Sequence, residues 1–238
     1  LSREGVMAVL VYQPVLALAW WLSAPLRGAE AGAGLPVDVR WVIWAALLAA
    51  LGTVVCTAMI YASLKPIPAW RHPLVLPVYL VFALLCGLLL MMLGQRLAGG
   101  VAIAPLLVVA AGLAVLLAMM KGLYWRSIDR KPLPVSKASA MGLPEGREVS
   151  VFERPHTEAN YLTTEMGFVL ARKHSRKLRV IAVLLFGLVP VLCCWLAWMF
   201  QDAATPVLAV AVLASLLGAL VERWLFFAEA KHLVMLYY

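Results

Sequence analysis

The sequence predicts an all-α membrane protein, built as a polytopic bundle of about six transmembrane helices. The chain has 238 residues, of which 64% are hydrophobic and only 13% are charged. Soluble domains are about half apolar and about a quarter charged, so this composition does not fit a soluble domain. The apolar residues also gather into long runs, and a helix needs about 20 of them to cross the hydrocarbon core of a bilayer.

Six apolar runs are long enough to cross, and none has a charged residue at its centre. This exclusion is typical of lipid-embedded helices, because burying Lys, Arg or Asp at mid-membrane is costly. Tryptophans cluster near the ends of the runs, where their rings prefer the headgroup layer. One such run could be the core of a soluble domain, but six in succession indicate a single membrane domain over residues 1–238. The predicted spans are residues 5–25, 41–64, 74–94, 101–120, 178–200 and 204–228.

Basic residues are distributed unevenly between the two sides of the predicted bundle. If the six spans alternate in direction, 17 of the 20 Lys and Arg residues lie on one side and three on the other. The positive-inside rule places the richer side, and both ends of the chain, in the cytoplasm. Because these residues flank membrane spans, where anionic lipid attracts them, we expect membrane lipid and not nucleic acid as their partner.

The longest predicted connection is a cytoplasmic loop over residues 121–177. Prolines and glycines, Pro132 and Pro134 among them, are expected to break any helix in its first part. Apolar residues then recur at helical spacing over residues 157–177, which predicts an amphipathic helix on the membrane surface. This helix is either a lipid anchor or a docking platform for a cytoplasmic partner. The candidate docking residues are Arg126, Arg130, Lys131, Tyr161, Glu165, Arg172 and Lys173.

The sequence carries no motif for cofactor-dependent catalysis. All four histidines fall at span ends or in loops, so no pair can ligate a haem at mid-membrane. HExxH, P-loop and GxGxxG motifs are absent, as is CxxC spacing, and we expect no buried acid–base relay. We therefore expect neither haem nor a metal in this chain, and no catalysis of a terminal reaction by it.

Ionisable residues gather at the predicted cytoplasmic span ends, beside aromatic rings. Glu222 and Glu229 are seven residues apart and share a helix face, with Phe226 between them. Such a rim could bind a polar headgroup and exchange protons, as a quinone requires. The alternative is ordinary interfacial ion pairing, which the spacing alone favours. The candidate quinone-binding residues are Arg3, Glu4, Trp70, Arg71, His72, Arg223, Glu229 and His232.

Four segments carry a family resemblance. LSREG at Leu1–Gly5 resembles the Ser-x-Glu start of the third span in the membrane anchor subunits of dimethyl sulfoxide reductase, and MIYASLKPIPAW at Met59–Trp70 resembles that family's link between the fourth and fifth spans. TEANYLTTEMGF at Thr157–Phe168 and VERWLFFAEAKH at Val221–His232 are similar to segments of the branch that serves cytoplasmic sulfite-oxidising molybdoenzymes. The resemblance covers most of the chain.

The resemblance implies a three-part complex in a bacterial inner membrane. A catalytic subunit would hold molybdopterin, a second subunit would carry iron–sulfur clusters, and the anchor would bind ubiquinone or menaquinone. Glu4 matches a family glutamate implicated in quinol binding. Two upstream spans and a family histidine have no counterpart here, and the chain starts at Leu1 rather than Met. If these spans precede Leu1, the complete protein has eight spans; if they are absent, the quinol site is incomplete.

The sequence leaves two other functions open. A purely structural tether for the soluble subunits would use the same basic surface for docking alone. A small transporter would need a polar pathway at the membrane midplane or an inverted repeat, and the sequence shows neither.

Overall fold

The computed structural model describes residues 6, 10, 11, 15, 37–99, 104–130, 135–144, 148–150 and 172–233. All regular secondary structure in these residues is helical. Five helical segments are long and apolar enough to cross a membrane, and each matches a predicted span. The span predicted over residues 5–25 lies almost wholly outside the described residues. The five segments are Trp41–Ala62, Val75–Leu97, Ala104–Arg130, Ser175–Met199 and Gln201–Ala228.

The chain divides into two compact units, residues 1–61 and residues 62–238. Helix α2 (Val37–Ala62) provides the described span of the first unit. Its two threonines bond back into their own helix: Thr53 Oγ1 donates to the Ala49 carbonyl at 2.9 Å, and Thr57 Oγ1 donates to the Thr53 carbonyl at 2.8 Å. These bonds satisfy the hydroxyl groups without water, as a helix in lipid requires.

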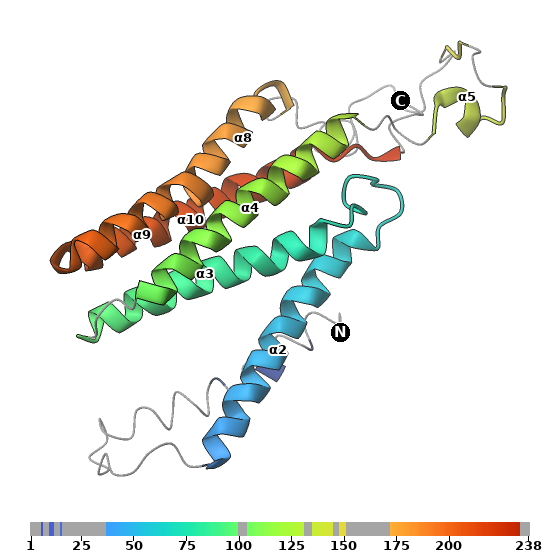
Figure 1. Ribbon diagram of the computed structural model, residues 1–238. Helices are drawn as coiled ribbons and strands as arrows, with labels where there is room; N and C mark the ends of the chain where they lie inside the picture. Colours follow the sequence, from blue (N-terminus) through green and yellow to red (C-terminus); the bar gives the residue numbers. More distant parts are fainter. Residues whose placement is uncertain are drawn as a thin grey trace, which may run out of the picture. The chain divides into compact units, whose positions relative to one another are not determined.

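Four spans of the second unit form a helical bundle (Figure 1). Helix α3 packs against α4 and α10, and α9 packs against the same two helices, so α4 and α10 occupy opposite corners of the bundle. Phe82 of α3 and Phe186 meet edge to face in the core, with ring centroids 5.1 Å apart. The elements are α3 (Val75–Leu97), α4 (Ala104–Arg130), α8 (Ser175–Val183), η2 (Leu184–Leu188), α9 (Val189–Met199), η3 (Gln201–Ala203) and α10 (Ala204–Ala228).

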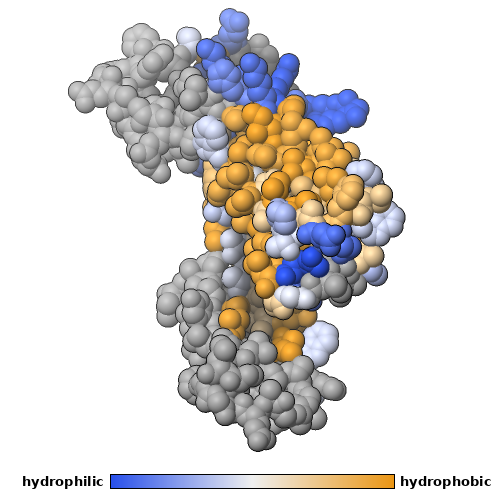
Figure 2. All heavy atoms as spheres, turned by 90° about the vertical axis from the view of Figure 1, so that its left-hand side faces the viewer, coloured by the Kyte–Doolittle hydropathy of each residue, from blue (hydrophilic) through white to orange (hydrophobic). Residues whose placement is uncertain are grey.

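The outer surface of the helices is apolar. Large side chains that a soluble protein would bury are exposed, such as Val108 (72%), Leu213 (60%) and Leu220 (67%). Figure 2 shows this apolar surface on the flank of the helices, with hydrophilic residues gathered toward the ends. Contact with lipid chains carries no free-energy penalty for such a surface, because the chains are as apolar as the side chains.

A widened π-helical turn interrupts the span Ser175–Met199. The Val189 N–H bonds to the Leu184 carbonyl five residues back, and Pro190 follows directly. Proline has no N–H to offer and its ring crowds the preceding turn, so the helix widens ahead of it. Gly218 of α10 packs against this turn: a Cβ atom there would lie 2.7 Å from the Phe186 nitrogen. The bundle therefore needs glycine at this position.

Two predictions about the long loop are wrong in part. Helix α4 continues to Arg130 instead of ending at residue 120, because its buried face continues through Lys121, Tyr124 and Trp125. A short helix, α5 (Lys137–Ala140), also forms within the loop, where Ser136 and Ser139 cap each other's backbone N–H. The predicted surface helix over residues 157–177 lies mostly outside the described residues.

Candidate functional site at the polar end of the bundle

Three charged side chains lie together inside one end of the bundle. Lys121 Nζ of α4 donates to Glu222 Oε1 of α10 at 2.5 Å, and these side chains are only 2% and 1% exposed. Arg223 Nη2 donates to the second carboxylate oxygen of Glu222 at 3.1 Å. Taking ions out of water costs several kcal/mol each, so a buried ion pair is a poor way to gain stability. An ionisable cluster within membrane helices instead indicates a functional site.

Aromatic rings cover the two cations of this cluster. Lys121 Nζ lies 4.1 Å from the ring centroid of Tyr124 and 4.8 Å from that of Trp125. The Arg223 guanidinium carbon lies 4.0 Å from the ring centroid of Tyr79 and 4.8 Å from that of Phe226. The faces of these rings stabilise positive charge while keeping water out.

The cluster borders a narrow slot between α3, α4 and α10. The slot has a volume of about 10 Å³, which is room for one water molecule. Arg223 Nη1 is buried beside it and has no hydrogen-bond partner among the described residues. The slot therefore offers an unused donor next to a carboxylate. It is lined by Leu74, Val75, Val78, Tyr79, Lys121, Tyr124, Glu222, Arg223 and Phe226.

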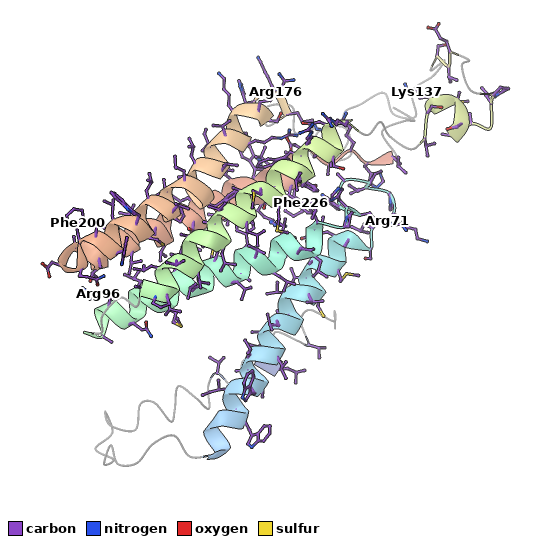
Figure 3. The ribbon with its side chains drawn as sticks, in the orientation of Figure 1. Arg71, Arg96, Lys137, Arg176, Phe200 and Phe226 are labelled. Carbon is purple, nitrogen blue, oxygen red and sulfur yellow. The ribbon has the colours of Figure 1, made fainter. Side chains whose placement is uncertain are left out.

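A wider groove of about 810 Å³ lies over the same end of the bundle. It is formed by the segment before α3, the end of α4, the start of α8 and the residues after α10. In Figure 3, Arg71, Phe226 and Arg176 lie toward this end of the helices, and Arg96 and Phe200 lie at the other. The groove is lined by Pro68, Ala69, Arg71, His72, Pro73, Ser127, Ile128, Asp129, Arg130, Arg172, Ser175, Arg179, Glu229 and Lys231.

A second charged cluster lines the groove and is centred on Arg179 of α8. Its guanidinium forms a two-bond fork with Asp129, at 2.6 and 2.9 Å, while Nε donates to Glu229 Oε1 at 2.7 Å. Burial raises the pKa of the Glu229 carboxyl, and the hydrogen bond from Arg179 opposes that rise. Glu229 Oε2 is also buried and has no hydrogen-bond partner among the described residues. Glu229 is therefore a carboxyl that holds its proton more tightly than usual.

Tyr124 separates the slot from the groove. Its ring lines the slot, and its hydroxyl donates to the carbonyl of Ala69, which lines the groove, at 3.2 Å. The His72 ring meets Tyr124 edge to face with centroids 5.3 Å apart, and His72 Nε2 lies 3.0 Å from Ser127 Oγ. Tyr124 at the slot and His72 at the groove thus lie in direct contact.

The segments that contain Trp70 and Arg172 are held against the end of α10 by side-chain hydrogen bonds. Trp70 Nε1 donates to the Phe226 carbonyl at 2.9 Å, and its ring stacks on Phe226 at 5.5 Å. Arg172 donates to the carbonyls of Ala228 and Ala230, at 2.8 and 3.0 Å. These bonds satisfy carbonyls at the end of α10 that have no partner within the helix.

The structure brings several of the predicted site residues together. Trp70 and Arg223 meet around Phe226, beside the slot. The predicted residues that line the groove are Arg71, His72, Arg130, Arg172 and Glu229. His232, Arg126 and Lys173 line neither space. Arg3, Glu4, Lys131, Tyr161 and Glu165 lie outside the described residues.

Sequence reasoning missed the centre of the site. We expected no buried acid–base relay, and that expectation did not anticipate the buried pair of Lys121 and Glu222. The available signal was the placement of Tyr124 and Trp125 three and four residues after Lys121. That spacing puts aromatic and basic groups on one helix face. Arg179 and Tyr79 were missed as well, because nothing local to them in sequence indicates their partners.

The five apolar helices and the family relationship make this a multi-pass membrane protein. The chain belongs to the DMSO reductase anchor subunit (DmsC) family, whose sequence model matches residues 1–228. It is a membrane anchor subunit of a DMSO reductase-type complex, which implies catalytic and electron-transfer partner subunits. It is 29% identical to the C subunit of the sulfite dehydrogenase of Allochromatium vinosum over 245 residues, which cover all of this chain and 73% of that protein. No solved structure matches the chain.

Proposed function

We propose that this anchor binds quinone or quinol and exchanges electrons between the quinone pool and an iron–sulfur subunit of a molybdopterin oxidoreductase. The observation that carries the proposal is the buried cluster of Lys121, Glu222 and Arg223 beneath aromatic rings, at the polar end of an apolar bundle. A quinone headgroup needs an apolar surface for its ring and polar partners for its two oxygens. This cluster combines both within a few ångströms.

The side chains at the outer face of the slot fit such a headgroup. Arg223 is 27% exposed, so its guanidinium can meet a quinone oxygen at the outer face of the slot. Tyr79 and Phe226 offer aromatic surfaces on either side of that guanidinium. The slot itself holds only one water, so the ring would rest against these three residues and not inside the slot. A bound quinone supplies two-electron, two-proton chemistry.

The groove end of the bundle is the proposed face for the partner subunits. It carries Arg71, Arg130 and Lys231 in addition to the Arg179 cluster, so an acidic protein surface would complement it. By the positive-inside rule this face is cytoplasmic, in a bacterial inner membrane, and both ends of the chain lie on that side. Because the Allochromatium relative belongs to a sulfite dehydrogenase, we propose sulfite as the substrate of the catalytic partner.

The test is Arg223→Gln in the complete complex, purified with its partner subunits. We expect quinone-coupled turnover to fall about tenfold or more, as loss of a charged contact to a reacting oxygen does. Binding of decylubiquinone should weaken in parallel, while turnover with a soluble artificial electron acceptor, which bypasses the anchor, should be unchanged. Arg176→Gln is the matched control, because Arg176 is an exposed arginine at the same end of the bundle.

Two results would overturn the proposal. One is a wild-type complex that does not bind decylubiquinone. The other is an Arg223→Gln complex with wild-type binding and wild-type quinone-coupled turnover. A wild-type complex that never transfers electrons to quinone would instead support the structural tether, in which the basic groove serves docking alone.

A further inference from the structure

We infer that Lys121 and Glu222 exchange protons between the quinone site and water in the groove, with Tyr124 and His72 as the connection. This role rests on the proposed quinone site and deepens it. It specifies the residues that move protons and the side of the protein to which the protons go.

The first support is the free-energy cost of burying the charges of Lys121 and Glu222. Lys121 and Glu222 are almost completely buried, and they join two helices at opposite corners of the bundle. Well-packed apolar side chains would hold those helices at least as well as a buried ion pair does. An acid and a base in direct hydrogen-bond contact are, however, what proton exchange in a dry environment requires. The pair is therefore better explained by proton transfer than by stability.

The second support is the continuity from the pair to the groove. Lys121 Nζ lies 4.1 Å from the centre of the Tyr124 ring, within the slot that has room for one water. A water there would have Lys121, Glu222 and the buried Nη1 of Arg223 as polar neighbours, enough to hold it in place. On the other side of Tyr124, His72 and Ser127 are in hydrogen-bond contact at 3.0 Å and line the groove. Tyr124 is thus the side chain that lies between the slot and the His72–Ser127 pair at the groove.

The third support is the set of charged groups around the pair. Arg223 and Tyr79 face it from α10 and α3, and both lie on the side of the proposed quinone contact. Arg179 and Glu229 lie on the groove side, where the Arg179 guanidinium contacts the Trp125 ring at 5.4 Å. The half-buried Glu229 carboxyl has one oxygen unpaired among the described residues and opens to the groove. A carboxyl and an imidazole that can exchange protons with water therefore stand on the groove side of the pair.

For quinone reduction, the transfer balances in atoms and electrons. Lys121 gives a proton from its ammonium, through a water in the slot, to a quinone oxygen beside Arg223: an N–H bond breaks, an O–H bond forms, and the nitrogen keeps the electron pair. The electrons come one at a time from an iron–sulfur carrier of the partner subunit, which is oxidised. Lys121 regains a proton from groove water through Tyr124 and His72, while Glu222 holds the charge. A second identical cycle completes the two-electron, two-proton reduction, and quinol oxidation runs the same steps in reverse.

The test uses Glu222→Gln, Lys121→Met and Tyr124→Phe in the complete complex. We expect quinone-coupled turnover of the first two variants to fall about 100-fold, the usual contribution of a proton-transfer group. Decylubiquinone affinity, measured by calorimetry, should stay within about threefold of wild type. These residues are proposed to transfer protons during the reaction and not to hold the quinone in the ground state. Tyr124→Phe keeps the ring and removes only the hydroxyl, and it should increase the solvent deuterium isotope effect on turnover. Glu148→Gln and Lys177→Met are controls, since both residues are exposed.

Each outcome has a distinct meaning. If Glu222→Gln and Lys121→Met keep wild-type turnover, or lose turnover only in proportion to decylubiquinone affinity, the inference is wrong and the quinone site stands. If the wild-type complex does not bind decylubiquinone, the proposed function is wrong, and the inference that rests on it is wrong as well. Turnover with the artificial acceptor reports whether a variant has assembled, and the isosteric Glu222→Gln decides the question if Lys121→Met does not assemble.

Discussion

Lys121 and Glu222 are 101 residues apart in sequence and 2.5 Å apart in space. Their contact runs from α4 to α10, between helices that both pack against α3 and α9. The pair therefore ties together two diagonal corners of the bundle. Removing the pair should therefore lower the stability of the bundle as well as the rate of proton transfer.

Lys121→Met alone should destabilise the protein strongly, because it leaves the Glu222 carboxylate buried with only Arg223 beside it. Breaking a buried pair by removing one partner costs about 3–5 kcal/mol. The double variant Lys121→Met with Glu222→Leu should recover most of that loss, since neither charge then stays buried. Thermal unfolding of the detergent-solubilised protein measures both effects. A double variant as unstable as the single one would show that the pair itself is the stabilising element.

Gly218→Ala should destabilise the bundle at the π-helical turn. The added methyl group would lie 2.7 Å from the Phe186 nitrogen, a backbone atom that cannot move aside cheaply. Overpacking of this kind costs about 1–3 kcal/mol. Gly112→Ala in α4 is the matched control, because a Cβ atom there meets nothing within 4 Å. Equal melting temperatures for the two variants would contradict the close approach of α10 to Leu184–Leu188.

Glu229→Gln should change how stability depends on pH. Burial raises the pKa of this carboxyl above its ordinary value of 4.5, so the folded protein binds the proton more tightly than the unfolded chain does. Its stabilising contribution is therefore complete below pH 4.5 and is lost as the pH rises through the folded-state pKa. Melting temperatures measured from about pH 4 to about pH 8 should show wild type losing its advantage over Glu229→Gln as the pH increases. A constant difference between the two proteins would mean that Arg179 cancels the effect of burial.

Arg172→Met should loosen the residues that follow α10. The guanidinium donates to the carbonyls of Ala228 and Ala230, and hydrogen bonds from charged donors are worth about 1.5–3 kcal/mol. Amide hydrogen exchange over residues 229–233 should accelerate, with little change inside the helix itself. Lys173→Met, one residue away and exposed, should leave the exchange rates unaltered.

The sequence predicted the five described spans but not which side chains of each helix are buried. Apolar run length depends only on local composition, so five described helices match their predicted positions. The end of α4 was misplaced because Lys121 was interpreted as the first residue outside the membrane, where a lone lysine would lie. Its burial depends on Glu222, and no local pattern reveals a partner in another helix. His72 and Glu229 were chosen because they stand beside aromatic residues at span ends, a pattern that is visible in the sequence, and the structure places both in the groove.

The separation of Lys121 from Glu222 along the chain also bears on how the protein is made. The ribosome delivers α4 to the insertion machinery long before α10 exists, so the lysine must first enter the membrane without its counter-charge. Its place near the helix end lets the ammonium reach the interface during that interval. The last helix to be synthesised then neutralises it and completes the bundle. A nascent chain that stops before α10 would therefore keep an unmatched cation at the end of α4.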